Sequence, residues 1–541
     1  MHQDPFRTTS RFKRNIIFNW LSPLIIMLSL FFTTQSMAET SPPPADESTQ
    51  ASFATTFENN IDQVFEVLNN AVTQVVFYDV RIPGVTNDLG EPTGIPLIVF
   101  VLISGCLIFT FYFRFINIRM FKHAIDVVRG KFDNKNDDGE ISSFQALASA
   151  LSATVGLGNI AGVAVAMHLG GPGAVFWMWV MAFFGMSLKF TECSFAILYR
   201  HVDTNGHVLG GPMVYLKEGF AERFESSIGK MFGKILSVIF AICVILGSIG
   251  GGNMFQSNQS YQLVAQQSPF IADNPLVFGV ILAVLAGAVI IGGIKRIGSI
   301  TSKLVPAMCV SYVLVCLYII FANASLIPDM FASIFSQAFN PDAGLGGLVG
   351  VMIVGIKRAA FSNEAGLGSS AIAHSAAKTS EPVREGLVAM LEPFIDTIVV
   401  CTMTALAILI TNAHIESGAQ DIAITAYAFG KVHPFLPTLL TAAVVVFAFS
   451  TLISWSYYGE RASEYLFGNI GIILFKILFV IFIAIAPMVG LANAITFSEI
   501  MILSLAFANI LGLLIIAPKL KPLVDDYVHR LKSGRMKPND D

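Results

Sequence analysis

The chain is organised around long apolar segments separated by short polar ones. Eleven stretches of about 20 apolar residues, each long enough for a helix to cross a hydrocarbon core of roughly 30 Å, follow residue 94. They lie near residues 95–114, 144–168, 173–198, 233–254, 275–294, 301–322, 346–372, 386–411, 435–458, 470–487 and 492–517. The pattern predicts an all-α polytopic membrane protein whose transmembrane core spans residues 95–518.

Charge placement predicts which loops face the cytoplasm. Only 13% of the 541 residues are charged, against about 25% in soluble domains. The segments 255–274, 323–345, 412–430 and 488–491 contain no Lys or Arg, whereas the intervening loops and the tail 519–541 are basic. Because short cytoplasmic loops are enriched in Lys and Arg, this predicts a bacterial inner-membrane protein with a cytoplasmic C-terminus. Lys431 is a mild exception, and a net charge of −4 without a basic patch indicates no nucleic-acid partner.

The first 94 residues precede this core. Residues 1–38 combine four basic residues, an apolar stretch and the small-residue pattern Ser36-Met37-Ala38, which is typical of a cleaved signal peptide. The alternative is an uncleaved anchor helix, because the apolar stretch is long. Residues 39–94 begin with a polar Pro/Ser linker and continue with apolar residues at helical spacing from Phe57 to Val76. We expect a periplasmic linker and an amphipathic helix there.

Two of the apolar segments are interrupted by glycines at corresponding places. The segment 144–171 contains GLGNIA, and the segment 346–377 contains GLGSSA. By the predicted topology the two lie in five-helix halves of opposite orientation. Unwinding a helix in a membrane frees backbone groups that cost several kcal/mol each unless they are satisfied, and paired breaks of this kind indicate a transporter's midplane site. The freed amides suit a carboxylate, and the freed carbonyls suit a cation.

Polar residues beside these breaks are the candidate binding groups. Thr154 and Asn159 flank Gly156 and Gly158, and we expect all four to contribute to a substrate site, whereas Gly162 and Gly170 suit close helix packing. The amides of Asn253 and Gln256 near the end of span 233–254 could bind substrate or cap a helix end. The hydroxyls of Ser450 and Thr451 could bind a ligand or their own helix backbone.

Charged residues at membrane depth need partners. Lys357 and Arg358 lie in the span 346–372, where an unpaired charge costs at least about 2.5 kcal/mol. The candidates for pairing are Glu364, Asp396 and Glu392, and we expect a structural ion-pair network of Arg358, Glu364 and Asp396 in preference to substrate contact. We place His374 and Glu192 near the cytoplasmic interface. The absence of an HExxH motif, of metal-type Cys spacing and of a nucleophile with its base argues against an enzyme.

Several ordered strings resemble one known family. LSATVGLGNIAGVAVA, GGPGAVFWMW, TECSFAILYR, GGPMVYL and KRAAFSNEAGLGSSAIAH are similar to the alanine or glycine:cation symporter family, also called sodium:alanine symporters, over residues 95–520. The resemblance implies a leucine-transporter-like inverted five-plus-five helix repeat preceded by one extra transmembrane helix. It places substrate at Thr154, Gly156, Gly158, Gln256, Phe361 and Asn363. It places sodium at the carbonyls of Ser152 and Val155 and at Ser450 and Thr451.

These observations together predict a secondary active transporter that imports alanine or glycine with co-transported sodium. The alternative is a proton-coupled transporter of alanine, serine or another small solute, with Asp396 and Glu364 as proton carriers. A channel should show repeated polar lining without paired helix breaks, so the pattern disfavours one. The lipid bilayer and a small amino acid are the expected partners, and no obligate protein partner is evident.

Overall fold

The computed structural model describes residues 76–86, 92–134, 137–339, 344–419 and 421–538, with scattered positions between 63 and 74. The predicted signal segment 1–38 and the linker after it lie outside the described residues. The described positions from 63 to 76 are helical, and the side-chain amide of Asn69 donates to the carbonyl of Asn493 at 3.1 Å. The amphipathic helix itself stays a prediction.

Two short hairpins interrupt the helical chain. Strands β1 (Asp79–Thr86) and β2 (Pro92–Pro96) pair antiparallel with Val80 opposite Ile95 and lead directly into helix α3 (Leu97–Tyr112). Strands β3 (His201–Val202) and β4 (Val208–Leu209) pair antiparallel between two helices. The apolar periodicity used above identifies only long spans, so neither hairpin was predicted.

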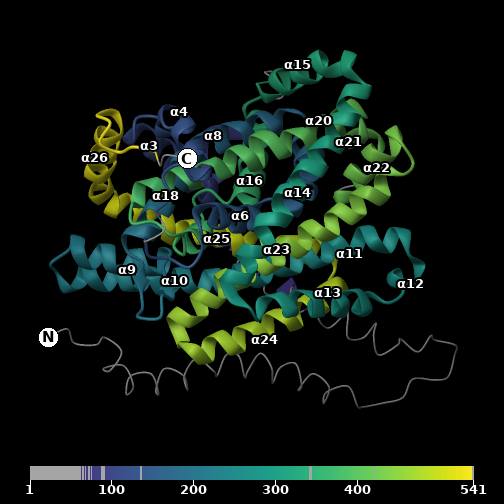
Figure 1. Cartoon of the computed structure of the whole chain (residues 1–541). Coiled ribbons are helices and arrows are strands. Elements are labelled where there is room, and N and C mark those ends of the chain that lie inside the picture. The colour runs from purple at the N-terminus through teal and green to yellow at the C-terminus, as the bar shows by residue number, and fades with distance from the viewer. Residues whose placement is uncertain are drawn as a thin grey trace. The chain divides into compact units, whose positions relative to one another are not determined.

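Most predicted spans coincide with helices long enough to cross a membrane (Figure 1). Among the described residues seven helices meet this length and composition, or eight if the bent pair α6 (Ser143–Thr154) and α7 (Ala161–Gly170) forms one span. The seven are Gly173–Leu198, Ser227–Gln267, Gly293–Ala322, Pro382–Ile410, Leu436–Phe467, Asn469–Met488 and Ala492–Lys532. The predicted all-α polytopic class is therefore confirmed.

The three remaining predicted spans correspond to helices outside that set. They are α3, α13 (Pro275–Ile290) and α16 (Gly344–Asn363). Helix α3 is apolar but has only 16 residues, so the extra transmembrane helix ahead of the repeat stays a prediction. The other helices are α4 (Ile116–Arg119), α5 (Phe121–Val128), α9 (Pro212–Arg223), α12 (Pro269–Ala272), α15 (Ile327–Ala338), α17 (Ser370–His374), α21 (Ala413–Glu416) and α22 (Ile422–Val432).

Two long spans contain wider π-helical turns, which often occur at functional sites. The predicted span 233–254 corresponds to α10 (Ser227–Ile249), the π-helix Gly250–Met254 and α11 (Phe255–Gln267). Residues 255–267, which were predicted to form a loop, therefore continue the helix. The predicted span 386–411 corresponds to α18 (Pro382–Ala389), α19 (Leu391–Pro393), the π-helix Phe394–Cys401 and α20 (Thr402–Ile410).

Loops predicted to share a membrane face contact one another. On the predicted cytoplasmic face, the amide of Lys378 donates to the carbonyl of Ile141 at 2.7 Å. There the tail helix α26 (Leu520–Lys532) also pairs through Arg530 with Glu381 at 2.7 Å. On the opposite face, Trp177 at the start of α8 (Gly173–Leu198) donates to the carbonyl of Ala338 at 3.3 Å. These contacts agree with the prediction that successive loops lie on alternating faces of the membrane.

Helix starts follow local sequence signals. Ser142 and Gln145 form a reciprocal capping box at the start of α6, which satisfies two backbone donors that lack intrahelical partners. Helix α14 (Gly293–Ala322) begins after Gly292 without a side-chain cap. The last three long helices, α23 (Leu436–Phe467), α24 (Asn469–Ile485) and α25 (Leu491–Ile516), complete the bundle.

Candidate functional site

The first helix break lies between α6 and α7, whose axes differ by 55°. The 3-10 turn Leu157–Asn159 fills the gap. The side-chain oxygen of Asn159 accepts from the amide of Gly156 at 2.9 Å, and Gln256 of α11 accepts from the amide of Leu157 at 3.4 Å. Side chains therefore satisfy the backbone groups that the break frees, as buried amides require.

The second break lies between α16 and α17. Gly366 and Gly368 have φ of +92° and +77°, and Glu364 has φ of +56°, which is a strained conformation for a residue with a side chain. Trp455 of α23 donates to the Glu364 carboxylate at 3.1 Å, and Ser369 donates to its other oxygen. These contacts hold the chain in the unwound conformation between the two helices.

The first break packs against the end of α16, just before the second break. A Cβ on Gly158 would lie 3.2 Å from the Cα of Ser362, so glycine permits this approach. Helix α16 packs on both α7 and the turn at Leu157–Asn159. The first glycine motif therefore lies against the last residues of α16, shortly before the second glycine motif. Paired helix breaks of this kind mark transporter binding sites.

Asp396 links both breaks by hydrogen bonds. Its Oδ1 accepts from Asn159 at 2.6 Å, and its Oδ2 accepts from Ser362 at 2.9 Å and from Thr397 at 2.7 Å. The amide of Asn363 in turn donates to Thr397 at 3.0 Å. Asp396 lies in the π-helix Phe394–Cys401 and is fully buried. It therefore holds the two unwound segments in one arrangement.

The predicted ion-pair network is wrong in its pairing. Arg358 pairs with Glu499 of α25, and Lys357 lies 3.4 Å from the same carboxylate. Glu364 and Asp396 instead accept hydrogen bonds from neutral side chains. The sequence could not indicate Glu499, because nothing along the chain shows which face of α16 meets α25.

Breaking this buried pair is expected to destabilise the protein. Arg358→Met leaves the Glu499 carboxylate with Lys357 alone, and we expect the free energy of unfolding to fall by about 3 kcal/mol. The double variant Arg358→Met/Glu499→Leu should recover most of that loss, because replacing both partners removes the unpaired charge. Chemical unfolding of the detergent-purified variants measures both values. Equal destabilisation by the single and double changes would contradict the pairing.

The predicted sodium ligands lie together where α6 ends against α23. The hydroxyl of Thr451 donates to the carbonyl of Ser152 at 3.0 Å, and the hydroxyl of Ser152 donates to the carbonyl of Ser450 at 2.7 Å. Val155 caps the end of α6 and is buried. Each hydroxyl uses its one proton in these bonds and keeps lone pairs that can face a cation. The structure thus groups hydroxyl and carbonyl oxygens of α6 and α23 at one place.

Among the predicted substrate residues, Gly156, Gly158, Asn159 and Gln256 lie at the first break, whereas Asn253 and Thr154 donate to backbone carbonyls elsewhere. A Cβ on Gly156 would collide with the Thr451 hydroxyl and lie 3.4 Å from the side-chain oxygen of Gln256. Phe361 stacks edge-on against Phe255 with ring centres 5.2 Å apart. Asn253 turns away and donates to the carbonyl of Phe479 at 2.7 Å. The hydroxyl of Thr154 donates to its own helix at Ala150.

A buried charged cluster behind the second break was not predicted. His374 lies 2.6 Å from both Glu385 and Glu392, and Lys189 lies 3.3 Å from Glu392 and 2.6 Å from Ser370. All four charged side chains are fully buried. His374 and Glu192 are both fully buried within the protein, and their placement near the cytoplasmic interface stays a prediction. The sequence did contain one signal for this cluster. Lys189 lies inside an apolar run, and charged residues within a membrane mark functional or structural networks.

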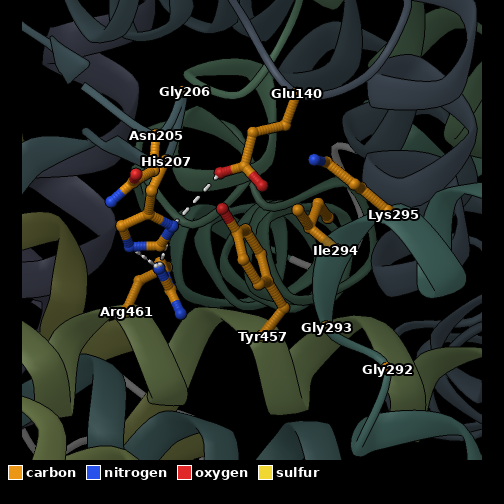
Figure 2. A pocket seen from close by; sticks show the side chains of 10 residues that line it. All are labelled: Glu140, Asn205, Gly206, His207, Gly292, Gly293, Ile294, Lys295, Tyr457 and Arg461. Carbon is orange, nitrogen blue, oxygen red and sulfur yellow. Dashed lines mark hydrogen bonds and ion pairs between the residues drawn. The ribbon is translucent and has the colours of Figure 1, made fainter. Parts of the chain in front are cut away.

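A second polar cluster lies on the predicted cytoplasmic face (Figure 2). His207, in the loop between β3 and β4, lies 3.5 Å from Glu140 and 3.1 Å from Glu464 of α23. Arg461 pairs with Glu464 at 2.7 Å. The hydrogen bonds to Glu140 and then to Glu464 raise the pKa of His207 to about 9. The hairpin is thus tied both to the segment before α6 and to the end of α23.

This pKa predicts a pH-dependent contribution to stability. Because the folded pKa of His207 exceeds the ordinary value of about 6.5, its stabilisation is complete below that value and disappears as the pH rises through about 9. The ring is 37% exposed, so we expect a difference between wild type and His207→Gln of below about 1 kcal/mol. Thermal unfolding in detergent at pH 6, 8 and 10 should show this difference shrinking. A constant or growing difference would contradict the prediction.

The fold and the paired breaks define a multi-pass membrane transporter. The sequence profile of the sodium:alanine symporter family matches residues 83–541, and the chain belongs to this family. The "Sodium/alanine symporter AgcS" of Methanococcus maripaludis is 43% identical over 426 residues, which are 78% of this chain and 92% of that protein. The "Amino-acid carrier protein AlsT" of Bacillus subtilis is 30% identical over 438 residues, which are 80% and 90% of the two chains.

The chain also matches solved structures. MhsT in complex with L-phenylalanine matches 70% of this chain and 98% of its own, with a TM-score of 0.41 and 16% sequence identity. From its family, the chain is a cation-coupled amino-acid transporter.

Proposed function

We propose that the protein imports alanine or glycine together with sodium, and that substrate binds between the two helix breaks. The observation that carries this proposal is the approach of the first break to the end of α16 at Gly158 and Ser362, with Asp396 bonded to both Asn159 and Ser362. The amides of Gly156 and Leu157, which now donate to Asn159 and Gln256, would exchange these partners for the substrate carboxylate, and the side-chain oxygen of Gln256 would bind the ammonium group. Phe361 and Trp455 pack against Gly251 and Gly252 of the π-helix that directly precedes α11, the helix carrying Gln256, and this close packing favours a small substrate.

Sodium would bind where α6 and α23 meet. The carbonyls of Ser152 and Val155 and the hydroxyls of Ser450 and Thr451 supply oxygen ligands of the type that discontinuous helices offer to sodium. Moving one positive charge inward yields about 2.3 kcal/mol per 100 mV, which corresponds to roughly fifty-fold accumulation. The predicted topology places release at the cytoplasmic face of a bacterial inner membrane.

Uptake into proteoliposomes tests this function. Purified protein is reconstituted, and uptake of radiolabelled alanine is measured under an inward sodium gradient, then with potassium replacing sodium at matched potential and pH, and then under a proton gradient. Accumulation that requires sodium is expected. Accumulation with protons alone would instead establish the proton-coupled alternative, and the lack of saturable alanine and glycine uptake from folded protein would refute the substrate assignment.

A variant pair locates the sodium site. Thr451→Val removes a hydroxyl at nearly constant volume and is expected to raise the sodium concentration for half-maximal uptake about tenfold, because one ligand is lost. Thr438→Val, an exposed position on the same helix, is the matched control and should behave as wild type. Equal sodium dependence in both variants would remove Thr451 from the proposed site.

A further inference from the structure

A cavity of about 250 Å³ opens beside the His207 cluster (Figure 2). Four parts of the chain line it: Glu140 before α6, the hairpin residues 205–207, the start of α14 and residues Tyr457 and Arg461 of α23. Drug-sized ligands occupy larger pockets, of about 300–1,000 Å³. The volume of this cavity therefore suits a smaller molecule.

One wall of the cavity offers groups that bind anions. The 30-residue helix α14 begins at Gly293 with no side-chain cap, and Gly292, Gly293, Ile294 and Lys295 all line the cavity. The first amides of a helix lack intrahelical acceptors and carry the positive end of the helix dipole. Lys295 is exposed and has no ion pair or side-chain hydrogen bond within the described chain. This wall thus presents a positive charge and free donors to the cavity.

Tyr457 gives independent evidence for a ligand. Its side chain is 2% exposed, and its hydroxyl has no hydrogen-bond partner among the described residues. Figure 2 shows this hydroxyl directed into the cavity between Glu140 and the start of α14. Buried hydroxyl groups are nearly always hydrogen-bonded, so the cavity is the place where its partner would lie.

Glu140 brings an acidic group to the same cavity. One of its carboxylate oxygens accepts from the amide of Val208 at 2.9 Å and faces His207 at 3.5 Å, while its other oxygen is free to accept from a ligand. Arg461 pairs with Glu464 at 2.7 Å and with Glu460 at 2.5 Å. The cavity therefore presents both positively charged donors and a carboxylate acceptor.

We infer that this cavity is a second binding site for a small zwitterionic amino acid. The carboxylate would bind the start of α14, Lys295 and the Tyr457 hydroxyl, and the ammonium group would bind Glu140. Tyr457 follows Thr451 by six residues on one helix, which is roughly 9 Å, so the site lies between the central breaks and the predicted cytoplasmic face. It would hold substrate on its way out, and this role rests on the proposed function.

The test measures binding of radiolabelled alanine to the purified full-length protein, with sodium and with choline in its place. The second site uses no sodium ligand, so we expect two alanines per chain with sodium and one without it. Lys295→Gln and Tyr457→Phe should each weaken the sodium-independent component about tenfold or more, because each loses a bond to a charged group. Arg296→Gln, at the adjacent exposed position, is the matched control and should bind as wild type.

Two alanine analogues test the zwitterion requirement. Propionate lacks the ammonium group and alanine amide lacks the carboxylate, and neither should displace alanine from the sodium-independent site. Displacement by propionate as effective as that by unlabelled alanine would show an anion site only and overturn the inference. So would a single, strictly sodium-dependent alanine per chain that neither Lys295→Gln nor Tyr457→Phe affects.

The outcomes separate this inference from the proposed function. Sodium-driven uptake with only one alanine bound per chain would support the function and overturn the second site. Binding that depends on Lys295 and Tyr457 in a protein that accumulates no alanine would support the site and overturn the function. If folded wild-type protein showed neither sodium-driven alanine uptake nor sodium-independent alanine binding, the proposed function and the second site would both be refuted.

Discussion

Replacing Asp396 by asparagine is expected to reduce the initial rate of sodium-driven alanine uptake about 100-fold. The two carboxylate oxygens accept three hydrogen bonds, from Asn159, Ser362 and Thr397. In either orientation an asparagine amide would face at least one of these donors with its own N–H groups. An unsatisfied buried donor and the loss of charged hydrogen bonds together cost about 3 kcal/mol, which corresponds to the stated factor.

The measurement is the initial rate in proteoliposomes containing equal amounts of folded protein, as judged by size-exclusion chromatography. Asp329→Asn, an exposed carboxylate on α15, is the matched control and should transport as wild type. The reduced rate should persist at saturating sodium, because Asp396 contacts the breaks and not the predicted sodium ligands. Near-normal uptake by Asp396→Asn would show that its hydrogen bonds do not hold the transporting arrangement.

Adding one methyl group at Gly156 is expected to abolish measurable uptake. The Cβ of Gly156→Ala would collide with the Thr451 hydroxyl, which belongs to the predicted sodium site, and would lie close to Gln256. Small-to-large changes in a tightly packed site cost about 1–3 kcal/mol in displaced neighbours. Here the displaced neighbours are the groups proposed to bind ion and substrate, so transport is affected more strongly than stability.

Two other glycines of the same helix pair provide graded controls. Gly158→Ala should give an intermediate loss, because its Cβ would lie 3.2 Å from Ser362. Gly162→Ala should retain wild-type uptake, because no atom lies within 4 Å of the added methyl group, and alanine is favoured over glycine in a helix by about 1 kcal/mol. Uptake and thermal unfolding of the three variants are compared. Equal effects at Gly156 and Gly162 would contradict the assignment of Gly156 to the site.

The sequence predicted the helical spans, the paired breaks and the family, because these depend on local composition and order. Apolar length is set by bilayer thickness, and the glycines of GLGNIA and GLGSSA mark the two predicted breaks in the sequence itself. The grouping of Gly156, Gln256 and Thr451 was also anticipated, through the family resemblance. The bend between α6 and α7 agrees with the first predicted break, and Gly158 of that break lies against Ser362 near the end of α16.

Side-chain partners were decided by tertiary packing. The helical period leaves open which neighbour each face meets, so Arg358 was paired with the wrong acids and Asn253 was assigned to a site from which it points away. The cluster of Lys189, Glu392 and His374 combines residues from three separate helices. Only the folded chain shows that these charges are buried and paired.

By itself, therefore, the sequence determined that this is a membrane-embedded transporter of the sodium:alanine symporter family with two interrupted helices. Hydrophobic length, loop charge and glycine position are local properties of the sequence, so they can be read without the tertiary structure. The tertiary structure alone decided that Asp396 joins the two breaks and that Tyr457 faces a cavity with Glu140 and Lys295. Hydrogen bonds and ion pairs depend on distances of a few ångströms between residues that are far apart in the sequence, such as Asn159 and Asp396, and those distances are set when the helices pack.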